Sequence, residues 1–573
     1  MGTHGTAFAQ NRPLERAERQ RSAILGADRD DENAGRMTLP EEEEEDSAAD
    51  STPLGVNVSA LRLISHQSKT SPSPGPGSDR IEFDPDLNVP AGLEETLQTY
   101  LNEPISMALL SRLGKDIVSS WRESDYPLVD VYYPEQNITQ GRLQIVVREA
   151  VLGEKRVEGA RFSREELLLD QIPVETGDRV NRQVVQAGLD WLNENPVRQV
   201  NVIYDCGSTD GTSDLVIDVT ETKQLTAYAG FANTGVDQTG ENEWTFGFQF
   251  ANPLKTEQSI GYQYTSDLDW DSLSAHSVFY EAFLPWRHSL RVIGAQVAST
   301  AENPILLGVE GESRQFTAEY RVPLPRPGWN RKWRHAWTTA FDYKTTNTDL
   351  FFGGVTVFAS EIAIAQFRTE YEAHFPDRTG VSTFTAGLVA SPGELVDNND
   401  DANFAGARFG SEADYFYAFA EAEKLVRLPG DNTLRIATRG QASSDRLAST
   451  EQLLAGGYST VRGYDESLVR GDSGWITNLE LISREFAVCR HLGLECEDQW
   501  NAFLFYDVGL LSLSDPLPGE TDFSLQSVGL GLRTRFGDRG FARASYGWAV
   551  SDHGIAPILV DHGKLHFAVT LTY

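Results

Sequence analysis

From Gln224 to Tyr573, hydrophobic and polar residues alternate along the chain, and no helical periodicity remains. The alternating segments have roughly ten residues each, the length of a tilted strand that crosses a membrane. Clear examples are 243–250, 277–284, 289–299, 315–322, 336–343, 415–423, 501–506 and 542–550. Short turns, at 376–380, 429–433 and 537–540, alternate with long loops, at 391–413 and 450–473. The pattern predicts an up-and-down antiparallel β-barrel of about 16 strands over residues 223–573.

The last segment, residues 565–573, shows the alternation most clearly. Leu565, Phe567, Val569, Leu571 and Tyr573 project to one face and the intervening residues to the other. We expect Phe567 and Tyr573 to mark a C-terminal membrane strand, with the final aromatic residue in the barrel's aromatic girdle. A strand of a soluble β-sandwich would alternate in the same way, but the even repetition from Gln224 onward favours a barrel.

Upstream of the barrel, helical periodicity appears and one pattern of elements occurs twice. For residues 79–150 it predicts a strand at 80–83, helices at 92–101 and after Pro104, and strands at 128–133 and 142–149. For residues 151–222 it predicts a strand at 155–159, helices at 164–170 and 181–193, and strands at 199–205 and 213–220. Such a repeat indicates two copies of a small α+β module. The fold class is therefore α+β followed by all-β.

Residues 1–78 are predicted to be a disordered acidic segment, because few apolar residues offset the entropy of ordering. It contains an acidic run at 41–46 and a Ser-, Pro- and Gly-rich stretch at 69–78. Residues 15–25 form a candidate charged helix, which would act as a plug if it docked elsewhere. Residues 6–10 resemble the end of a secretory signal without its basic and apolar regions, which favours a truncated or misassigned start, with a chance likeness as the alternative.

Composition narrows the classes of partner. A net charge of −35 argues against nucleic acid, whose phosphates attract basic patches. No apolar run of about 20 residues is present, so no transmembrane helix is predicted. Cys489 and Cys496 flank a short loop and form a candidate disulfide in an oxidising compartment, with two free thiols as the alternative.

Three stretches stand out: residues 126–149, residues 198–202 with 211–219, and residues 456–464, which read Gly-Gly-Tyr-Ser-Thr-Val-Arg-Gly-Tyr. The first two are similar to the ends of the first and second POTRA domains of the TpsB family, and the third is similar to the family's signature loop. This family comprises the outer-membrane transporters of two-partner secretion of the haemolysin secretion/activation type. The Val-Arg-Gly-Tyr motif also occurs in the wider superfamily of outer-membrane assembly factors, whereas two POTRA modules point to the secretion branch. The resemblance implies POTRA modules at 79–150 and 151–222 and a barrel whose loop 450–473 folds inward.

The resemblance also implies a specific ion pair. In the family, the arginine of the loop motif pairs with the aspartate of a Phe-x-Asp-x-Gly motif on the inner barrel wall, which points here to Arg462 and Asp507. A guanidinium grips a carboxylate through two hydrogen bonds, and a strand glycine leaves room for the loop. The alternative is an exposed arginine in a surface loop. The other signature residues are Val461, Gly463, Tyr464, Phe505 and Gly509.

The second module offers a place for an unfolded client to bind. An unpaired sheet edge accepts an added strand, and a groove beside a helix accepts apolar side chains. The candidate contacts are Gln199, Val200, Asn201 and Val202 on the edge and Val185 and Leu189 on the helix. The alternative is that these residues form only the module's core.

No catalytic residues, metal ligands or cofactors are predicted. Residues 471–474, Gly-Asp-Ser-Gly, copy the nucleophile motif of trypsin-like proteases, but no histidine has a matching context. Asp267, Asp269 and Asp271 alternate as calcium ligands do, without a ligating glutamate at the right distance. No phosphate-binding Gly-x-x-x-x-Gly-Lys loop occurs.

These observations and the resemblance together predict an outer-membrane protein transporter with periplasmic POTRA modules. Its expected partners are a secreted exoprotein client and outer-membrane lipid, with no nucleic acid, and the expected state is a monomer. The predicted function is export of the client, with activation of a haemolysin- or adhesin-like client in some relatives. The alternatives are a barrel assembly factor, a passive pore or adhesin, and a surface hydrolase that depends on Ser473.

Overall fold

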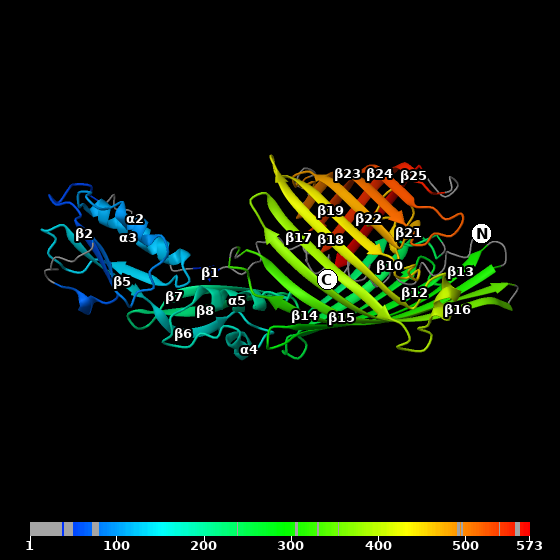
Figure 1. Cartoon of the computed structure of the whole chain (residues 1–573), viewed down its shortest axis with the longest axis horizontal. Coiled ribbons are helices and arrows are strands. Elements are labelled where there is room, and N and C mark those ends of the chain that lie inside the picture. The colour runs from blue at the N-terminus through cyan, green and yellow to red at the C-terminus, as the bar shows by residue number, and fades with distance from the viewer. Residues whose placement is uncertain are drawn as a thin grey trace. The chain divides into compact units, whose positions relative to one another are not determined.

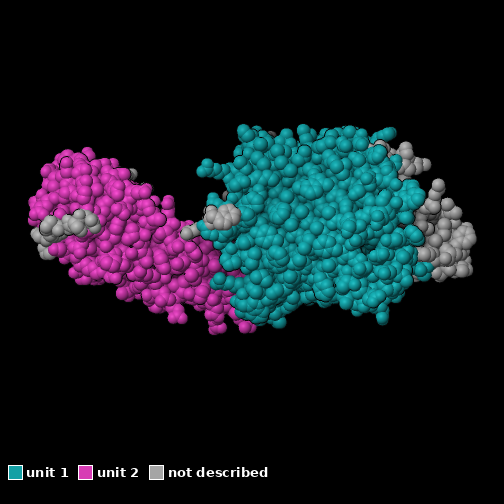
Figure 2. Space-filling model, in the orientation of Figure 1, with its two compact units in different colours: residues 1–28, 223–573 teal, residues 29–222 magenta. Residues whose placement is uncertain are grey.

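The computed structural model describes residues 37–38, 50–71, 80–237, 239–303, 307–328, 330, 332–352, 355–489, 493, 497–537, 539–555 and 562–573. The chain forms two compact units, one holding residues 223–573 and the other residues 29–222 (Figure 2). The predicted signal remnant at 6–10, the helix at 15–25 and the acidic run at 41–46 lie outside the described residues. In the described part of the chain, no helix has the length and apolarity needed to cross a membrane.

Residues 223–573 form a closed antiparallel barrel, which confirms the predicted fold class (Figure 1). Each strand pairs with its neighbour in the chain, except that the long loop separates β19 from β22, and β26 closes the ring against β9. The sixteen strands are β9 (Leu225–Ala232), β10 (Glu243–Ala251), β11 (Gln258–Asp267), β12 (Leu273–Phe283), β13 (Ser289–Asn303), β14 (Leu307–Leu324), β15 (Arg334–Phe352), β16 (Val355–Pro376), β17 (Gly380–Pro392), β18 (Asp414–Leu428), β19 (Asn432–Ser443), β22 (Ser473–Ile482), β23 (Asp498–Ser512), β24 (Phe523–Phe536), β25 (Gly540–His553) and β26 (Gly563–Thr572).

The two faces of the barrel wall differ in polarity. Large apolar side chains remain exposed on the outside, for example Phe367 and Leu504, at 53% and 58%. Their sequence neighbours Gln366 and Phe505 point inward and are buried. In β26, Leu565, Val569 and Leu571 are exposed while His566 is fully buried. The period-two alternation in the sequence therefore separates a lipid-facing surface from an occupied lumen.

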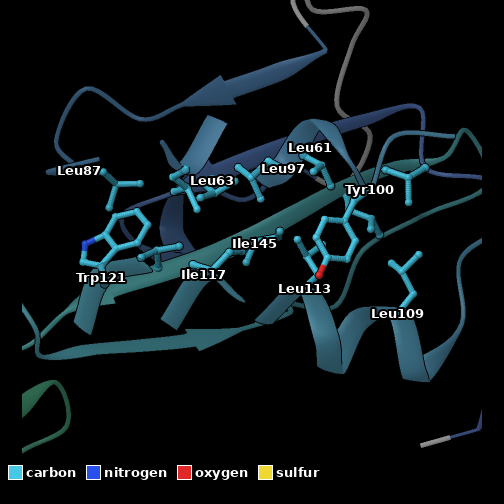
Figure 3. Packing of buried hydrophobic residues seen from close by; sticks show 14 of the residues in the cluster. Leu61, Leu63, Leu87, Leu97, Tyr100, Leu109, Leu113, Ile117, Trp121 and Ile145 are labelled. Carbon is cyan, nitrogen blue, oxygen red and sulfur yellow. The ribbon is translucent and has the colours of Figure 1, made fainter. Parts of the chain in front are cut away.

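The first module packs two helices against one sheet. Its sheet order is β3-β2-β5-β4, formed by β2 (Ala60–Ile64), β3 (Ile81–Phe83), β4 (Val129–Tyr132) and β5 (Arg142–Glu149). The helices are α2 (Leu93–Gln98) and α3 (Met107–Glu123), and the Ser106 side chain caps α3 by accepting a hydrogen bond from the Leu109 amide. Leu109, Leu113, Ile117 and Trp121 lie on the buried face of α3, as their spacing predicts (Figure 3).

Strand β2 corrects the prediction that residues 1–78 are disordered. Leu61 and Leu63 are fully buried in the first module's core, and β2 pairs in parallel with both β3 and β5. A short 3₁₀ turn, Gln67–Lys69, follows it. The alternating apolar residues of β2 offset the ordering entropy locally, although the composition of the whole segment is polar. The ordered module therefore begins before residue 79.

The second module has the sheet order β1-β7-β8-β6. Its elements are β6 (Val151–Glu158), α4 (Glu165–Asp170), α5 (Arg182–Leu192), β7 (Arg198–Cys206) and β8 (Thr212–Glu221). The additional strand β1 (Met37–Thr38) comes from the N-terminal segment and pairs in parallel with β7 at Val202 and Ile203. The β7 edge, which was predicted to be unpaired, is thus partly covered by the chain itself.

Candidate functional site

The connection between β19 and β22, residues 444–472 and hereafter the inner loop, folds back into the barrel. It forms a small hairpin of β20 (Leu453–Ala455) and β21 (Val469–Gly471), and the predicted motif lies between these strands. Gly456 and Gly457 begin the excursion with φ of +106° and +103°. A Cβ on Gly456 would lie 2.4 Å from the Asp465 carbonyl oxygen, so only glycine fits there.

Arg462, at the tip of the inner loop, is 2% exposed and contacts Asp507 of β23. Its Nε donates to Oδ2 of Asp507 at 2.7 Å and its Nη2 to Oδ1 at 2.6 Å, a two-pronged geometry. The Arg462 amide also donates to Oδ2, at 3.1 Å. Asp507 therefore holds both the side chain and the backbone of the loop tip. The structure brings together the two residues that the motifs singled out.

A second carboxylate, Glu480 of β22, completes the environment of Arg462. Arg462 Nη1 donates to Glu480 Oε1 at 2.5 Å, and Glu480 also accepts from Arg533 at 2.7 Å and Arg543 at 2.8 Å. Sequence reasoning missed Glu480. Glu480 lies on the inward face of β22, the same face as Asn478, and Asn478 is the register partner of Asp507. This shared face is the feature that could have pointed to it. With Arg435, which lies 3.9 Å from Glu480, two buried carboxylates and four arginines thus form one cluster.

Aromatic rings and a glycine shape the wall beneath the tip. The Arg462 guanidinium carbon lies 3.6 Å from the centroid of the Phe505 ring, a cation–π geometry. A Cβ on Gly509 would lie 3.0 Å from Cγ2 of Val461. Phe505 and Gly509 of the wall motif therefore receive Arg462 and Val461 of the loop motif.

The remaining motif residues attach the tip to the strands that close the barrel. Gly463 has φ of +90°, and a Cβ there would lie 2.8 Å from the backbone of Gly547 on β25. Its amide donates to Nε2 of the buried His566 at 3.1 Å. The Tyr464 hydroxyl donates to the carbonyl oxygens of Gln526 and Ser551. The tip therefore contacts β22 through β26.

The C-terminal end of the inner loop is fixed by Asp472, whose side chain is fully buried. Arg408 donates to both of its carboxylate oxygens, at 2.5 and 2.9 Å. Arg408 directly follows α6 (Asp401–Ala407), whose Phe404 is buried against β16 and β18 residues. The connection between β17 and β18 therefore fixes the inner loop at Asp472, where the loop continues into β22.

The Gly-Asp-Ser-Gly motif at 471–474 and the alternating aspartates at 267, 269 and 271 have structural roles. Ser473 exchanges hydrogen bonds with the backbone of Ser443. Asp267 accepts hydrogen bonds from the amides of Asp269, Ser272 and Leu273, which is the behaviour of a turn-stabilising carboxylate.

One group of carboxylates lies close enough to share a cation. Among the described residues, ligand atoms of Asp237, Glu241 and Asp465 lie within 4.8 Å of one another. The ammonium of Lys564 already sits there, 2.7 Å from Glu241 and 2.5 Å from Asp465. The protein's own lysine supplies the positive charge that this group attracts.

The predicted client contacts of the second module fall into two classes. Val185, Leu189, Val200 and Val202 are fully buried core residues, so their side chains are not available to a client. Gln199 and Asn201 are half-buried, and Ile203, beside them on β7, is exposed. Within residues 199–203 of β7, those that remain accessible are therefore Gln199, Asn201 and Ile203, and β1 pairs with the strand at Val202 and Ile203.

Only one of the two cysteines of the predicted disulfide lies among the described residues. Cys489 is disulfide-bonded, whereas its predicted partner Cys496 lies outside the described residues. Cys206, at the end of β7, is a free and exposed thiol.

Comparison with known protein families shows which family has this architecture. Residues 211–534 match the haemolysin secretion/activation protein ShlB/FhaC/HecB, and residues 79–150 match the POTRA domain of ShlB type. The chain therefore belongs to the haemolysin secretion/activation family, and it is an outer-membrane protein transporter of two-partner secretion. The suspected family, the function and the outer-membrane location are all confirmed.

Similar proteins agree with this assignment. The heme/hemopexin transporter protein HuxB of Haemophilus influenzae (strain 86-028NP) is 22% identical over 469 residues, covering 78% of each chain. The outer membrane transporter CdiB of Escherichia coli O6:K15:H31 is 21% identical over 401 residues, covering 68% of this chain and 66% of that protein. The solved structure of CdiB from Escherichia coli has a TM-score of 0.69 at 19% identity, covering 98% of this chain and 96% of that one.

Proposed function

We propose that this transporter exports a large, unfolded exoprotein and that the contact of Arg462 with Asp507 and Glu480 holds the inner loop in its resting position. The observation that carries this proposal is the buried two-pronged pair of Arg462 and Asp507 within the closed barrel. Breaking a buried ion pair leaves an uncompensated charge, so the loop has one strongly preferred position. Passage of a client requires the loop to leave it.

The second module supports the capture step of the proposal. In β1, Met37 and Thr38 pair in parallel with β7, and the Tyr204 hydroxyl lies 3.9 Å from the Met37 sulfur. The β7 edge therefore accepts an extended segment through backbone hydrogen bonds, the mode by which a strand-like client would bind. Client binding at Val202 and Ile203 requires β1 to leave.

The client is a secreted partner of the type that the family serves. The family description joins secretion with activation of a haemolysin, and we extend activation of the client to this chain. The similarity to a heme/hemopexin transporter protein and to the outer membrane transporter CdiB supports a transport role, which we extend to one dedicated client here.

The test compares culture medium and outer membrane from cells with and without this chain. We expect one large protein to disappear from the medium while the amounts of other membrane barrels stay constant. A joint fall of many barrels would instead identify a barrel assembly factor. Complementation with Arg462→Ala should fail to restore the missing protein. Full restoration would show that secretion does not need the tip contact. Bilayer conductance unaffected by Arg462→Ala, together with no secreted client, would favour a passive pore.

A further inference from the structure

We propose that Glu451 is a positioning residue, a second attachment point that ties the root of the inner loop to a different arc of the barrel wall from the one that holds Arg462. This proposal rests on the proposed function of the inner loop. It makes the loop a strap across the lumen, fixed at its root by Glu451 and at its tip by Arg462.

Glu451 is 4% exposed, and side chains of three strands donate hydrogen bonds to its carboxylate. Oε1 accepts from Nζ of Lys344 on β15 at 2.8 Å. Oε2 accepts from Nε2 of Gln366 on β16 at 3.2 Å and from the hydroxyl of Tyr417 on β18 at 3.1 Å. Each carboxylate oxygen is thus satisfied by wall side chains, as a buried charge requires.

The wall that receives Glu451 is itself held by a hydrogen-bonded network. The Tyr415 hydroxyl donates to Oε1 of Gln366 at 2.6 Å, and Gln366 donates to Asp342 at 3.4 Å. Asp342 accepts from the hydroxyl of Thr317 at 2.8 Å. Residues of β14, β15, β16 and β18 therefore orient the groups that meet Glu451. Such supporting contacts indicate a prepared binding place rather than a chance surface contact.

The two attachment points lie on separate arcs of the ring. Glu451 contacts β15, β16 and β18, whereas the tip contacts β22 through β26. In the closed order β9–β14 separate these arcs on one side. On the other side lies β19, which contacts the backbone of this stretch: Gln441 donates to the Glu451 carbonyl oxygen at 2.9 Å and Arg439 to the Ser459 carbonyl oxygen at 2.7 Å. Only ten residues separate Glu451 from Arg462 in the chain. The short connection means that the position of the root limits where the tip can reach.

The strap predicts how the loop moves. Release of Arg462 alone leaves the root tied at Glu451, so the tip swings while the loop stays in the lumen. Release of Glu451 lets the root shift and lowers the occupancy of the tip contact, although no tip residue has changed.

Trypsin cleavage after Arg462 measures tip docking directly, because this residue is buried in the docked loop. The assay uses the purified full chain in detergent, with heat-modifiable gel mobility to select folded barrel and planar-bilayer conductance as a second readout. For Glu451→Gln we expect cleavage after Arg462 to be about tenfold faster, a coupling of about 1.4 kcal/mol. Conductance bursts should become more frequent in parallel.

Two further variants separate positioning from general damage. The exchange Lys344→Glu with Glu451→Lys restores an ion pair of opposite polarity and should return cleavage most of the way to that of the unaltered chain. The matched control is Glu372→Gln, which removes a carboxylate of β16 that lies 3.4 Å from Arg321 of β14. It should leave the cleavage rate unchanged. If Glu451→Gln does not fold, Tyr417→Phe takes its place. This variant removes one hydrogen bond to Glu451 and should raise the rate of cleavage after Arg462 two- to threefold.

Several results would overturn the proposal. One is unchanged protection of Arg462 in folded Glu451→Gln or Tyr417→Phe, and another is equal acceleration by Glu372→Gln. Failure of the charge exchange to slow cleavage again would show that Glu451 serves folding alone. If Glu451→Gln exposes Arg462 while Arg462→Ala secretes normally, the second attachment stands and the proposed role of the tip contact in secretion fails.

Discussion

The tip and the root of the inner loop are both held by buried ion pairs, but the two pairs are built differently. At the tip, Arg462 grips two carboxylates through a planar guanidinium that rests on Phe505. At the root, the carboxylate of Glu451 meets one ammonium and two neutral donors. The tip therefore depends on planar geometry and on several charges together, whereas the root distributes its contacts among interchangeable donors. We expect the tip to tolerate substitution poorly and the root to tolerate it better.

The largest effect should come from removing the carboxylate at the tip. Asp507→Ala leaves Arg462 with a single carboxylate, Glu480, which already accepts from Arg533 and Arg543. Loss of one partner of a buried pair destabilises by ~4 kcal/mol. We expect secretion to fall to background and cleavage after Arg462 to accelerate more than in any root variant. Asp414→Asn, an exposed carboxylate at the start of β18, is the control and should behave like the unaltered chain.

A smaller effect should follow when the charge at the tip is kept and its shape is changed. Arg462→Lys cannot bond Asp507 through two nitrogens and Glu480 through a third. Loss of two charged hydrogen bonds destabilises the docked tip by ~3 kcal/mol. Secretion should drop at least tenfold while the barrel stays folded, as judged by gel mobility. Normal secretion by this variant would show that charge alone, without geometry, holds the tip.

The difference between tip and root also explains what the sequence could reveal. Alternation predicted the barrel because a wall between lipid and lumen imposes period two on nearly every strand. Arg462 and Asp507 were found through two short motifs. Glu480 and Glu451 were missed because each is one carboxylate in a chain with 84 acidic residues. Strand register brings Glu480 to its partners, whereas the fold of the inner loop brings Glu451 to Lys344, Gln366 and Tyr417. Strand β2 was missed because five ordered residues lie within a polar segment.

Removing the cation at the root should have an intermediate effect. In Lys344→Met, Glu451 keeps the Gln366 amide and the Tyr417 hydroxyl, so the carboxylate is not left without donors. We expect a loss of ~2 kcal/mol in loop docking, less than at the tip. Cleavage after Arg462 should lie between the rates of the unaltered chain and Asp507→Ala. A rate above that of Asp507→Ala would reverse the ranking of the two attachments.

The smallest effect should come from the outermost contact near the root, the pair of Arg446 and Glu520. Both oxygens of Glu520 accept from Arg446, at 2.7 and 2.9 Å, and this contact lowers the pKa of Glu520 from 4.5 to about 2. A lowered pKa means that the contribution is complete above pH 4.5 and is lost only as the pH falls through about 2.

Loop position, followed by trypsin cleavage after Arg462, should therefore not change between pH 8 and pH 6, within the working range of the protease. Glu520→Gln should have little effect at any pH, because Arg446 still donates to the carbonyl oxygens of Phe409, Ser514 and Asp515. A strong acceleration of cleavage by Glu520→Gln would show that the outer contacts, rather than Glu451, fix the root. The root would then be fixed by Arg446 and Glu520, and this ion pair, in place of the contacts of Glu451, would be the one to compare with the tip.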